Sequence, residues 1–232
     1  MRLDKYLSEC TALSRKEIKK LIKQGGVFVN SAVAQKAEQQ VLESDEISVL
    51  GECVEYKKYI YLMLNKPQGY LSAVWDREKP VVVDLVPEEY RHFDVSPVGR
   101  LDIDTEGLLI LTNDGDLNHR LTSPKKNVYK TYFARLDVPA EQSDIEEFSK
   151  GMEFSDFTAK PAELIITENK NEVYIKIAEG KFHQVKRMCA KVGKNVLYLK
   201  RVSIGSLLLD ETLKTGDLRV LTEEELELLF TN

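Results

Sequence analysis

Apolar residues recur every three or four positions in two segments near the N-terminus, LDKYLSECTAL and SRKEIKKLIKQGG. This spacing predicts two helices, each with one apolar face. Ser14 and Glu17 have the spacing of a capping box at the start of the second helix. Either Gly25 or Gly26 is expected to take the left-handed conformation that ends this helix.

The hydrophobic pattern changes to alternation after these helices. VFVN followed by SAV predicts a strand, a turn and a strand, and ESDEISVL predicts a further strand. The first 50 residues are therefore expected to form a small unit around one shared core. GECVEYKK, residues 51–58, has the character of a linker.

Strand-like segments dominate the chain from Tyr59 onward. Helical patterns interrupt them, and long connections and the hairpin turn NDG favour a largely antiparallel α+β arrangement. We therefore predict two domains, residues 1–58 and residues 59–232. The strand-like segments are YIYLMLN, GLLILTN, KTYFARL, ELIITE, EVYIKIAE and NVLYLKRVSIG, and the helical ones are at about 116–122, 140–151, 182–192 and 222–230.

The net charge of −5 conceals two basic segments. Residues 1–30 carry seven basic and three acidic side chains, and residues 181–201 carry seven basic side chains and no acid. Residues 216–232 are acidic, with five acids against one arginine. Because salt limits the reach of a charge to about 8 Å, such local patches decide the attraction to phosphate. The distribution predicts a polyanionic partner.

Composition and motifs argue against several classes of protein. The chain is 43% hydrophobic and 31% charged, which is typical of a globular protein, and its apolar runs are far shorter than the roughly 20 residues of a membrane span. MRLDKYLSEC lacks the apolar core of a signal peptide, so a cytoplasmic location is expected. Three widely spaced cysteines suit neither a disulfide framework nor a zinc site, and nucleotide-binding and common hydrolase motifs are missing. We expect no metal, no nucleotide cofactor and no membrane partner.

Four charged residues alternate ahead of the apolar run LLILT: Arg100, Asp102, Asp104 and Glu106. In an extended strand, Asp102 would point away from its two apolar neighbours and share a face with Arg100. Glu106 is interpreted as a solvated turn acid and Asp104 as a turn cap. A single aspartate near a cation can be structural or catalytic, and the pattern alone leaves both interpretations open.

The first 50 residues resemble an S4 domain, a small RNA-binding module. The resemblance is clearest in SRKEIKKLIKQGGVFVN, a basic capped helix that continues into a strand. It implies that the polar face of this helix binds RNA, whereas charge alone would equally suit a solvated surface helix. The implied RNA-binding residues are Arg15, Lys16, Lys19, Lys20 and Lys23.

GRLDIDTEGLLILTNDG is similar to the active-site motif of pseudouridine synthases, in the form used by the ribosomal small-subunit pseudouridine synthase A family. Three further segments resemble successive motifs of that family in the expected order: YLMLNKPQGYLS, HRLTSPKKNVYKTY and EGKFHQVKRMCAKVGKNVLYLKRVSIG. Together with the S4 unit, the resemblance covers essentially the whole chain. It implies a pseudouridine synthase fold and a reaction that needs no cofactor.

The resemblance also implies roles for single residues. The essential aspartate of the family falls on Asp102, its active-site tyrosine on Tyr132, and the cation that pairs with the aspartate on Lys186, with Arg187 as the alternative. From the residues alone, Tyr132 would be a half-buried strand aromatic and Lys186 a solvated helix lysine. The further residues expected to contact RNA are Arg100, Lys130, Lys181, Arg187, Lys191, Lys194, Lys200 and Arg201.

The implied reaction breaks the C1′–N1 bond of a uridine, rotates the uracil and joins its C5 to C1′. An ionised Asp102 would stabilise or capture the electron-poor sugar carbon, and a nearby Lys186 would favour the charged carboxylate. The resemblance implies a uridine of 16S rRNA as substrate, and a monomer is the default expectation. The alternatives are a 23S rRNA substrate and a non-catalytic RNA-binding or ribosome-assembly protein. A glycosidase would need a second positioned carboxylate.

Overall fold

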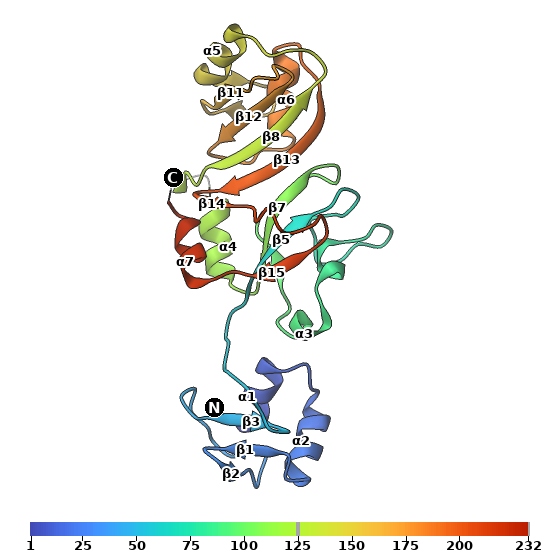
Figure 1. The fold of residues 1–232 in the computed structure, drawn as a ribbon, viewed down its shortest axis with the longest axis vertical. Coiled ribbons are helices and arrows are strands. Elements are labelled where there is room, and N and C mark those ends of the chain that lie inside the picture. The colour runs from blue at the N-terminus through green and yellow to red at the C-terminus, as the bar shows by residue number, and fades with distance from the viewer. Residues whose placement is uncertain (124–125, 232) are drawn as a thin grey trace. The chain divides into compact units, whose positions relative to one another are not determined.

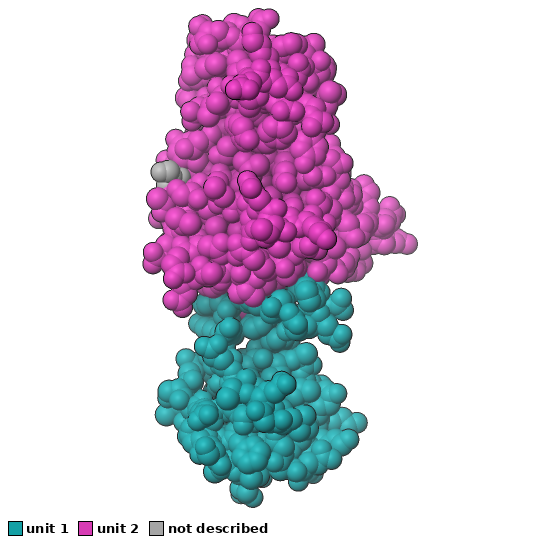
Figure 2. Space-filling model, viewed as in Figure 1, with its two compact units in different colours: residues 1–60, 86–95 teal, residues 61–85, 96–232 magenta. Residues whose placement is uncertain are grey.

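The computed structural model describes residues 1–123 and 126–231 (Figure 1). Pro124 and Lys125, which belong to the segment HRLTSPKKNVYKTY, and Asn232 lie outside the described residues. The chain divides into two compact units, residues 1–60 with 86–95 and residues 61–85 with 96–232 (Figure 2). The first has the elements expected of an S4 domain, and the second is a mixed, largely antiparallel sheet with helices, so the predicted α+β class is confirmed.

The first unit contains the helices α1 and α2 and a four-stranded antiparallel sheet with the order β2-β1-β3-β4. The apolar faces of both helices form its core, in which Leu7 and Ile18 are fully buried. The short helix α3 also belongs to this unit. The bounds are α1 Leu3–Cys10, α2 Arg15–Lys23, β1 Val27–Val29, β2 Ala32–Val33, β3 Ile47–Val49, β4 Glu52–Cys53 and α3 Glu88–Arg91.

Helix α2 begins and ends as its sequence predicts. The backbone N–H of Glu17 donates to the Ser14 hydroxyl at 3.4 Å, and the backbone N–H of Ser14 donates to the Glu17 carboxylate at 2.8 Å. This reciprocal capping box satisfies two N–H groups that the helix leaves without internal partners. Gly25 has a φ of 74° and is therefore the left-handed residue after the helix.

The second unit is built on a nine-stranded sheet with the central order β11-β12-β8-β13-β7-β5-β15. Strand β14 pairs with β13, and β6 pairs with β7. The pairing of β13 with β7 is parallel, and the other pairings between described strands of this sheet are antiparallel. The bounds are β5 Tyr61–Lys66, β6 Ser96–Pro97, β7 Glu106–Thr112, β8 Lys130–Leu136, β11 Glu163–Ile166, β12 Glu172–Ile177, β13 Val196–Ile204, β14 Leu207–Leu208 and β15 Leu218–Val220.

Helices cover this sheet, and each of the four helical patterns predicted after residue 59 is observed. Leu117 and Leu121 of α4 pack in one core cluster with Leu108 and Ile110 of β7. Helix α6 begins two residues later than expected, because His183 before it has a φ of 51°. The remaining elements are η1 Val82–Leu85, α4 Gly115–Thr122, α5 Gln142–Lys150, β9 Met152–Glu153, β10 Thr158–Ala159, α6 Gln184–Lys191 and α7 Glu223–Leu228.

The junction of β7 and β13 fixes the start of β7. Gly107 pairs with Arg201 and has a φ of 103°, and a Cβ atom at this position would lie 2.2 Å from the Arg201 carbonyl oxygen. Only glycine therefore permits this close approach of the two backbones. Arg201 also pairs with Tyr132 of β8, so the segment that precedes β7 ends beside the middle of β8.

Candidate active site

Asp102 lies in a turn before β7. The strand begins only at Glu106, so the extended conformation considered for Asp102 is wrong. The backbone N–H of Thr105 donates to the Asp102 carbonyl at 3.0 Å and closes the turn. The Asp102 side chain is half-buried, with 29% of its surface exposed.

Lys66, a buried lysine at the end of β5, donates hydrogen bonds to this turn. Lys66 is fully buried, and its ammonium donates to the carbonyl oxygens of Asp102 at 3.1 Å, Thr105 at 2.9 Å and Pro67 at 2.9 Å. Burial lowers the pKa of Lys66 to about 8, although neighbouring carboxylates, that of Asp104 first, act in the opposite direction. The sequence interpretation missed this residue. The signal was a lysine that directly follows an apolar strand pattern, within the segment YLMLNKPQGYLS that resembles a family motif.

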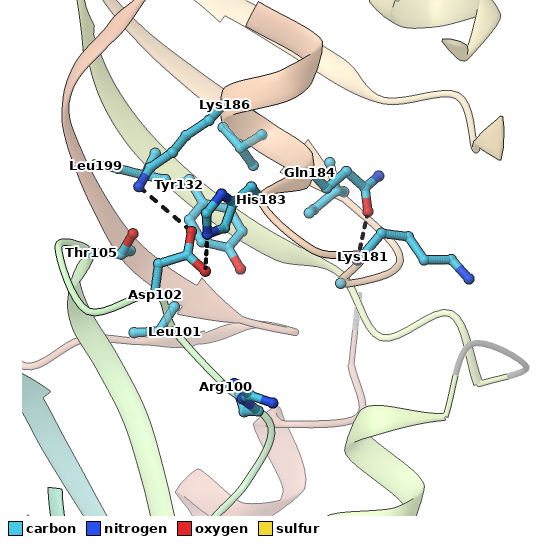
Figure 3. Close-up of a pocket in the computed structure, with 13 residues that line it drawn as sticks. Arg100, Leu101, Asp102, Thr105, Tyr132, Lys181, His183, Gln184, Lys186 and Leu199 are labelled. Atoms are coloured by element: carbon cyan, nitrogen blue, oxygen red, sulfur yellow. Dashed lines mark hydrogen bonds and ion pairs between the residues drawn. The ribbon is translucent and has the colours of Figure 1, made fainter. Parts of the chain in front are cut away.

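Two side-chain nitrogen atoms, one from Lys186 on α6 and one from His183 just before this helix, lie close to the Asp102 carboxylate (Figure 3). Lys186 Nζ lies 3.6 Å from Asp102 Oδ2, and His183 Nε2 lies 3.6 Å from Asp102 Oδ1. With only 23% of the Lys186 side chain exposed, water screens its charge less than it would on an open surface. Lys186 was expected beside Asp102, whereas His183 was not singled out.

Lys186 also makes a shorter contact with a second carboxylate. Its Nζ donates to Asp104 Oδ1 at 2.5 Å, so one ammonium lies between Asp102 and Asp104. Partial burial raises the pKa of Asp104, but the hydrogen bond and charge of Lys186 outweigh it and leave the pKa below 3.8. The interpretation of Asp104 as a turn cap missed this contact. Glu106 is not a solvated turn acid either, because it accepts a hydrogen bond from the Tyr198 hydroxyl at 2.6 Å.

Tyr132 forms a wall of the pocket that contains Asp102 (Figure 3). It lies on β8, is 7% exposed and pairs in register with Ile175 and Arg201 on the neighbouring strands. A ring face and apolar side chains beside a carboxylate suit a ligand with a flat ring and a polar centre. The lining residues are Arg100, Leu101, Asp102, Thr105, Tyr132, Ile177, Gly180, Lys181, His183, Gln184, Val185, Lys186 and Leu199.

Three residues expected to contact RNA are turned into the protein, which corrects that expectation. Arg201 is 4% exposed, and its Nε donates to the Leu108 carbonyl at 2.8 Å. Lys130 Nζ donates to the carbonyls of Val128 at 2.7 Å and Leu121 at 3.1 Å, and burial lowers its pKa to about 8. Lys194 is buried and paired with Asp144 at 2.8 Å. These cations fix backbone and helix positions.

Arg187 is not the partner of Asp102, so the alternative to Lys186 is wrong. Its guanidinium makes two hydrogen bonds to Asp156, at 3.0 and 2.5 Å. It also lies 4.7 Å from the ring centroids of both Phe154 and Phe157, which places it in a cation–π contact with the β9–β10 hairpin. Arg187 therefore ties α6 to this hairpin.

The other residues of the second unit that were expected to contact RNA are Arg100, Lys181, Lys191 and Lys200, and their surroundings differ. Lys181 is exposed at the pocket, and Arg100 also lines it. Lys191 Nζ contacts the backbone carbonyl of Glu153. Lys200 is half-buried on β13, opposite Glu106.

The basic residues predicted on α2 all lie on its exposed face. Ile18 and Ile22 point into the core of the first unit, so the basic side chains share the opposite side of the helix. Lys19 Nζ lies 3.9 Å from a carboxylate oxygen of Glu38, a long and exposed ion pair. Such a face can contact phosphates without breaking buried interactions. Its members are Arg15, Lys16, Lys19, Lys20 and Lys23.

Within residues 1–123 and 126–231, no three acidic, histidine or cysteine side chains converge as a metal site would require. No helix in the same ranges has the length and apolar character to cross a bilayer.

Sequence profiles of known families match both parts of the chain. The profile described as RNA pseudouridylate synthase matches residues 60–191, and the S4 domain profile matches residues 1–47. Together these matches cover the basic helix and, except for Leu199, the residues that line the pocket.

Full-length relatives give the same result. The chain is 47% identical to an uncharacterized RNA pseudouridine synthase of Bacillus subtilis, over 99% of this chain and 98% of that protein. It is 38% identical to the ribosomal small subunit pseudouridine synthase A of Escherichia coli, over 97% and 98% of the two chains. A crystal structure of a pseudouridylate synthase superimposes with a TM-score of 0.69 at 36% identity and covers 99% of both chains.

Proposed function

This chain belongs to the RNA pseudouridylate synthase family and carries an S4 domain, and from this premise we propose that Asp102 is the catalytic residue and that a uridine of 16S rRNA is the substrate. Membership makes the protein an isomerase that modifies rRNA. One observation carries the catalytic proposal: the Asp102 carboxylate lies in a pocket with Tyr132, within 3.6 Å of both Lys186 and His183.

The reaction conserves every atom of the nucleotide. The C1′–N1 bond breaks, the uracil turns, C5 bonds to C1′, the proton on C5 is lost and N1 gains a proton. Asp102 acts at C1′, where its negative charge stabilises or captures the electron-poor carbon. Lys186 and His183 orient the carboxylate, and the ammonium of Lys186 favours its ionised form.

Tyr132 holds the detached uracil by its ring face. Leu199 and Ile177 line the same pocket, so three apolar surfaces surround the position of the base. Water must be excluded while C1′ and N1 are separated, because water would otherwise add to C1′ and leave an abasic site. Lys66 does not touch the substrate in this scheme. It positions the Asp102 turn through its contacts with the carbonyls of Asp102, Ile103 and Thr105.

RNA binding is divided between two domains in this proposal. Residues 1–58 are the S4 domain and linker, whose exposed basic face on α2 contacts the RNA backbone, and residues 59–232 are the catalytic domain. Lys181 and Arg100 contact the strand that enters the pocket. These contacts offset the few kcal/mol, roughly, that extrusion of a uridine costs.

The 16S assignment is supported by identities of 37–40% to several ribosomal small subunit pseudouridine synthases A over nearly the full chain. The family site, uridine 516, is the proposed target. We further propose that the enzyme acts as a cytoplasmic monomer.

A single genetic experiment tests both parts of the proposal. Pseudouridines are mapped in 16S and 23S rRNA from cells that lack this protein and from the same cells complemented with each variant. We expect one 16S pseudouridine to be missing, and to be restored by the wild type and by Asp116→Asn, an exposed control on α4, but not by Asp102→Asn. Loss of a 23S site instead would overturn the 16S assignment, and restoration by Asp102→Asn would remove Asp102 from catalysis.

A further inference from the structure

Phe182 is an exposed aromatic residue between two residues that line the candidate active site. Its side chain is 70% exposed, whereas Lys181 and His183 on either side line the pocket. A single exposed apolar side chain is common on protein surfaces and needs no function by itself. Three further observations distinguish Phe182.

The loop that carries Phe182 is fixed at both ends by a buried hydrogen-bond network. The Gln184 side chain accepts from the backbone N–H of Lys181 at 3.0 Å and donates to the buried Glu179 carboxylate at 3.1 Å. The backbone N–H of Gln184 also donates to the Lys181 carbonyl at 3.1 Å. The phenyl ring is therefore held out on an ordered loop, so a ligand that binds it has little loop entropy to overcome.

The ring of Phe182 is stacked on the imidazole of His183. The two centroids are 3.8 Å apart with an interplanar angle of 18°, so His183 covers one face of the phenyl ring. His183 in turn reaches Asp102, 3.6 Å from its Nε2. The left-handed backbone of His183 produces this arrangement at the start of α6. A single aromatic layer thus separates Phe182 from the catalytic carboxylate.

The charge around Phe182 selects the chemistry of its ligand. Residues 181–201 contain no acidic side chain, and Lys181 is exposed beside the ring. A cation next to an open ring face matches a nucleotide, in which a phosphate adjoins a flat base. A phenyl ring offers no hydrogen bonds, so it would accept any of the four bases.

We propose that Phe182, supported by His183, is the stacking site for the nucleobase adjacent to the target uridine in the RNA strand. The inference rests on the proposed function, because it places the flipped uridine at Asp102. The neighbouring base leaves its own stack when the uridine is extruded, and Phe182 replaces the lost stacking partner. The protein thereby holds the strand open next to the pocket.

The test combines protein variants with modified RNA. A synthetic 16S rRNA fragment that spans the modified uridine is prepared intact and with an abasic nucleotide on either side of the target. Binding and single-turnover pseudouridine formation are measured for the wild type, Phe182→Ala, Phe182→Trp and the control Leu208→Ala, whose side chain is 68% exposed on β14. Thermal melting verifies that each variant is folded.

We expect Phe182→Ala to bind the intact fragment roughly 5- to 100-fold more weakly, and Phe182→Trp and Leu208→Ala to bind it like the wild type. On one of the two abasic fragments, wild type and Phe182→Ala should bind equally weakly, because the stacked base is missing. Equal binding of wild type and Phe182→Ala to intact RNA would overturn the inference. The inference would also fail if, on both abasic fragments, Phe182→Ala still bound more weakly than the wild type by the same factor as on intact RNA. If wild-type enzyme forms no pseudouridine in any rRNA, the proposed function fails instead.

Discussion

At the scale of single residues, the ammonium of Lys186 contacts the carboxylates of both Asp102 and Asp104. Lys186 lies 2.5 Å from Asp104 and 3.6 Å from Asp102, so distance alone would favour Asp104 as its partner. Asp104 is the more exposed of the two, however, with 63% of its side-chain surface accessible, and it is not among the pocket-lining residues. Asp104 is therefore a second anchor for Lys186, whereas Asp102 lines the pocket.

This division of roles predicts unequal effects of three substitutions. Asp102→Asn should abolish single-turnover activity, and Lys186→Met should reduce it by roughly 10- to 1,000-fold, because an electrostatic partner of the reacting carboxylate is removed. Asp104→Asn should cost less than about tenfold, since Lys186 can still pair with Asp102. RNA affinity should change only a few-fold in all three. If Asp104→Asn is as inactive as Asp102→Asn while Lys186→Met is active, the catalytic assignment belongs to Asp104.

Lys66 is the residue on which the stability of the active-site turn should depend. In Lys66→Met, the carbonyls of the turn lose their donor in a buried position, and we expect the free energy of unfolding at pH 7 to fall by about 2–3 kcal/mol. Burial lowers the pKa of Lys66 in the folded protein to about 8, below its ordinary 10.5. Between pH 8 and pH 10.5 the unfolded wild type therefore binds more protons at this lysine than the folded wild type does. The wild type should therefore gain stability relative to the variant as pH rises from 8 towards 10.5. Denaturant titrations of wild type and Lys66→Met at pH 7 and 9.5 measure both effects. If the difference in their free energies of unfolding were the same at both pH values, this role of Lys66 would be contradicted.

At the scale of elements, the close approach of β7 and β13 sets the position of the whole turn. Gly107→Ala would place a methyl group 2.2 Å from the Arg201 carbonyl and force alanine to a φ of 103°. We expect the free energy of unfolding to fall by about 3 kcal/mol or more, and activity to fall with it. Gly115→Ala is the matched control, because its Cβ meets no atom within 4 Å and its site is the first turn of α4. Thermal unfolding that leaves Gly107→Ala as stable as this control would contradict the argument.

The elements also show which parts of the structure local sequence can encode. The capping box of α2 and the apolar strand β7 depend on neighbours in sequence, and both were predicted correctly. The turn at Asp102 depends on Lys66, 36 residues earlier, and no local pattern contains that contact. Burial of Arg201 likewise follows from the pairing of β13 with β7 and β8, so its charge alone wrongly suggested a surface position. The site residues themselves came from family resemblance rather than from periodicity.

The distribution of charge is the relevant property of the whole molecule. The total of −5 would repel RNA, yet the exposed face of α2 presents five cations in one place. Because only charges within about a Debye length of a phosphate contribute, affinity should depend on where lysines lie rather than on how many the chain has. Two variants with the same net charge can separate these possibilities.

The first variant replaces Lys16, Lys19, Lys20 and Lys23 with Gln, and the second makes the same change at four exposed lysines elsewhere, Lys36, Lys57, Lys170 and Lys214. We expect the first to weaken binding to a 16S rRNA fragment at least tenfold, roughly, at low salt, and to flatten the plot of log affinity against log salt by about one unit for each phosphate that the variant no longer neutralises. The second should bind nearly as the wild type does, because none of its substituted lysines lies on α2. Binding measured from low to physiological salt distinguishes the two. Equal weakening in both variants would mean that total charge, and not the S4 face, attracts the RNA.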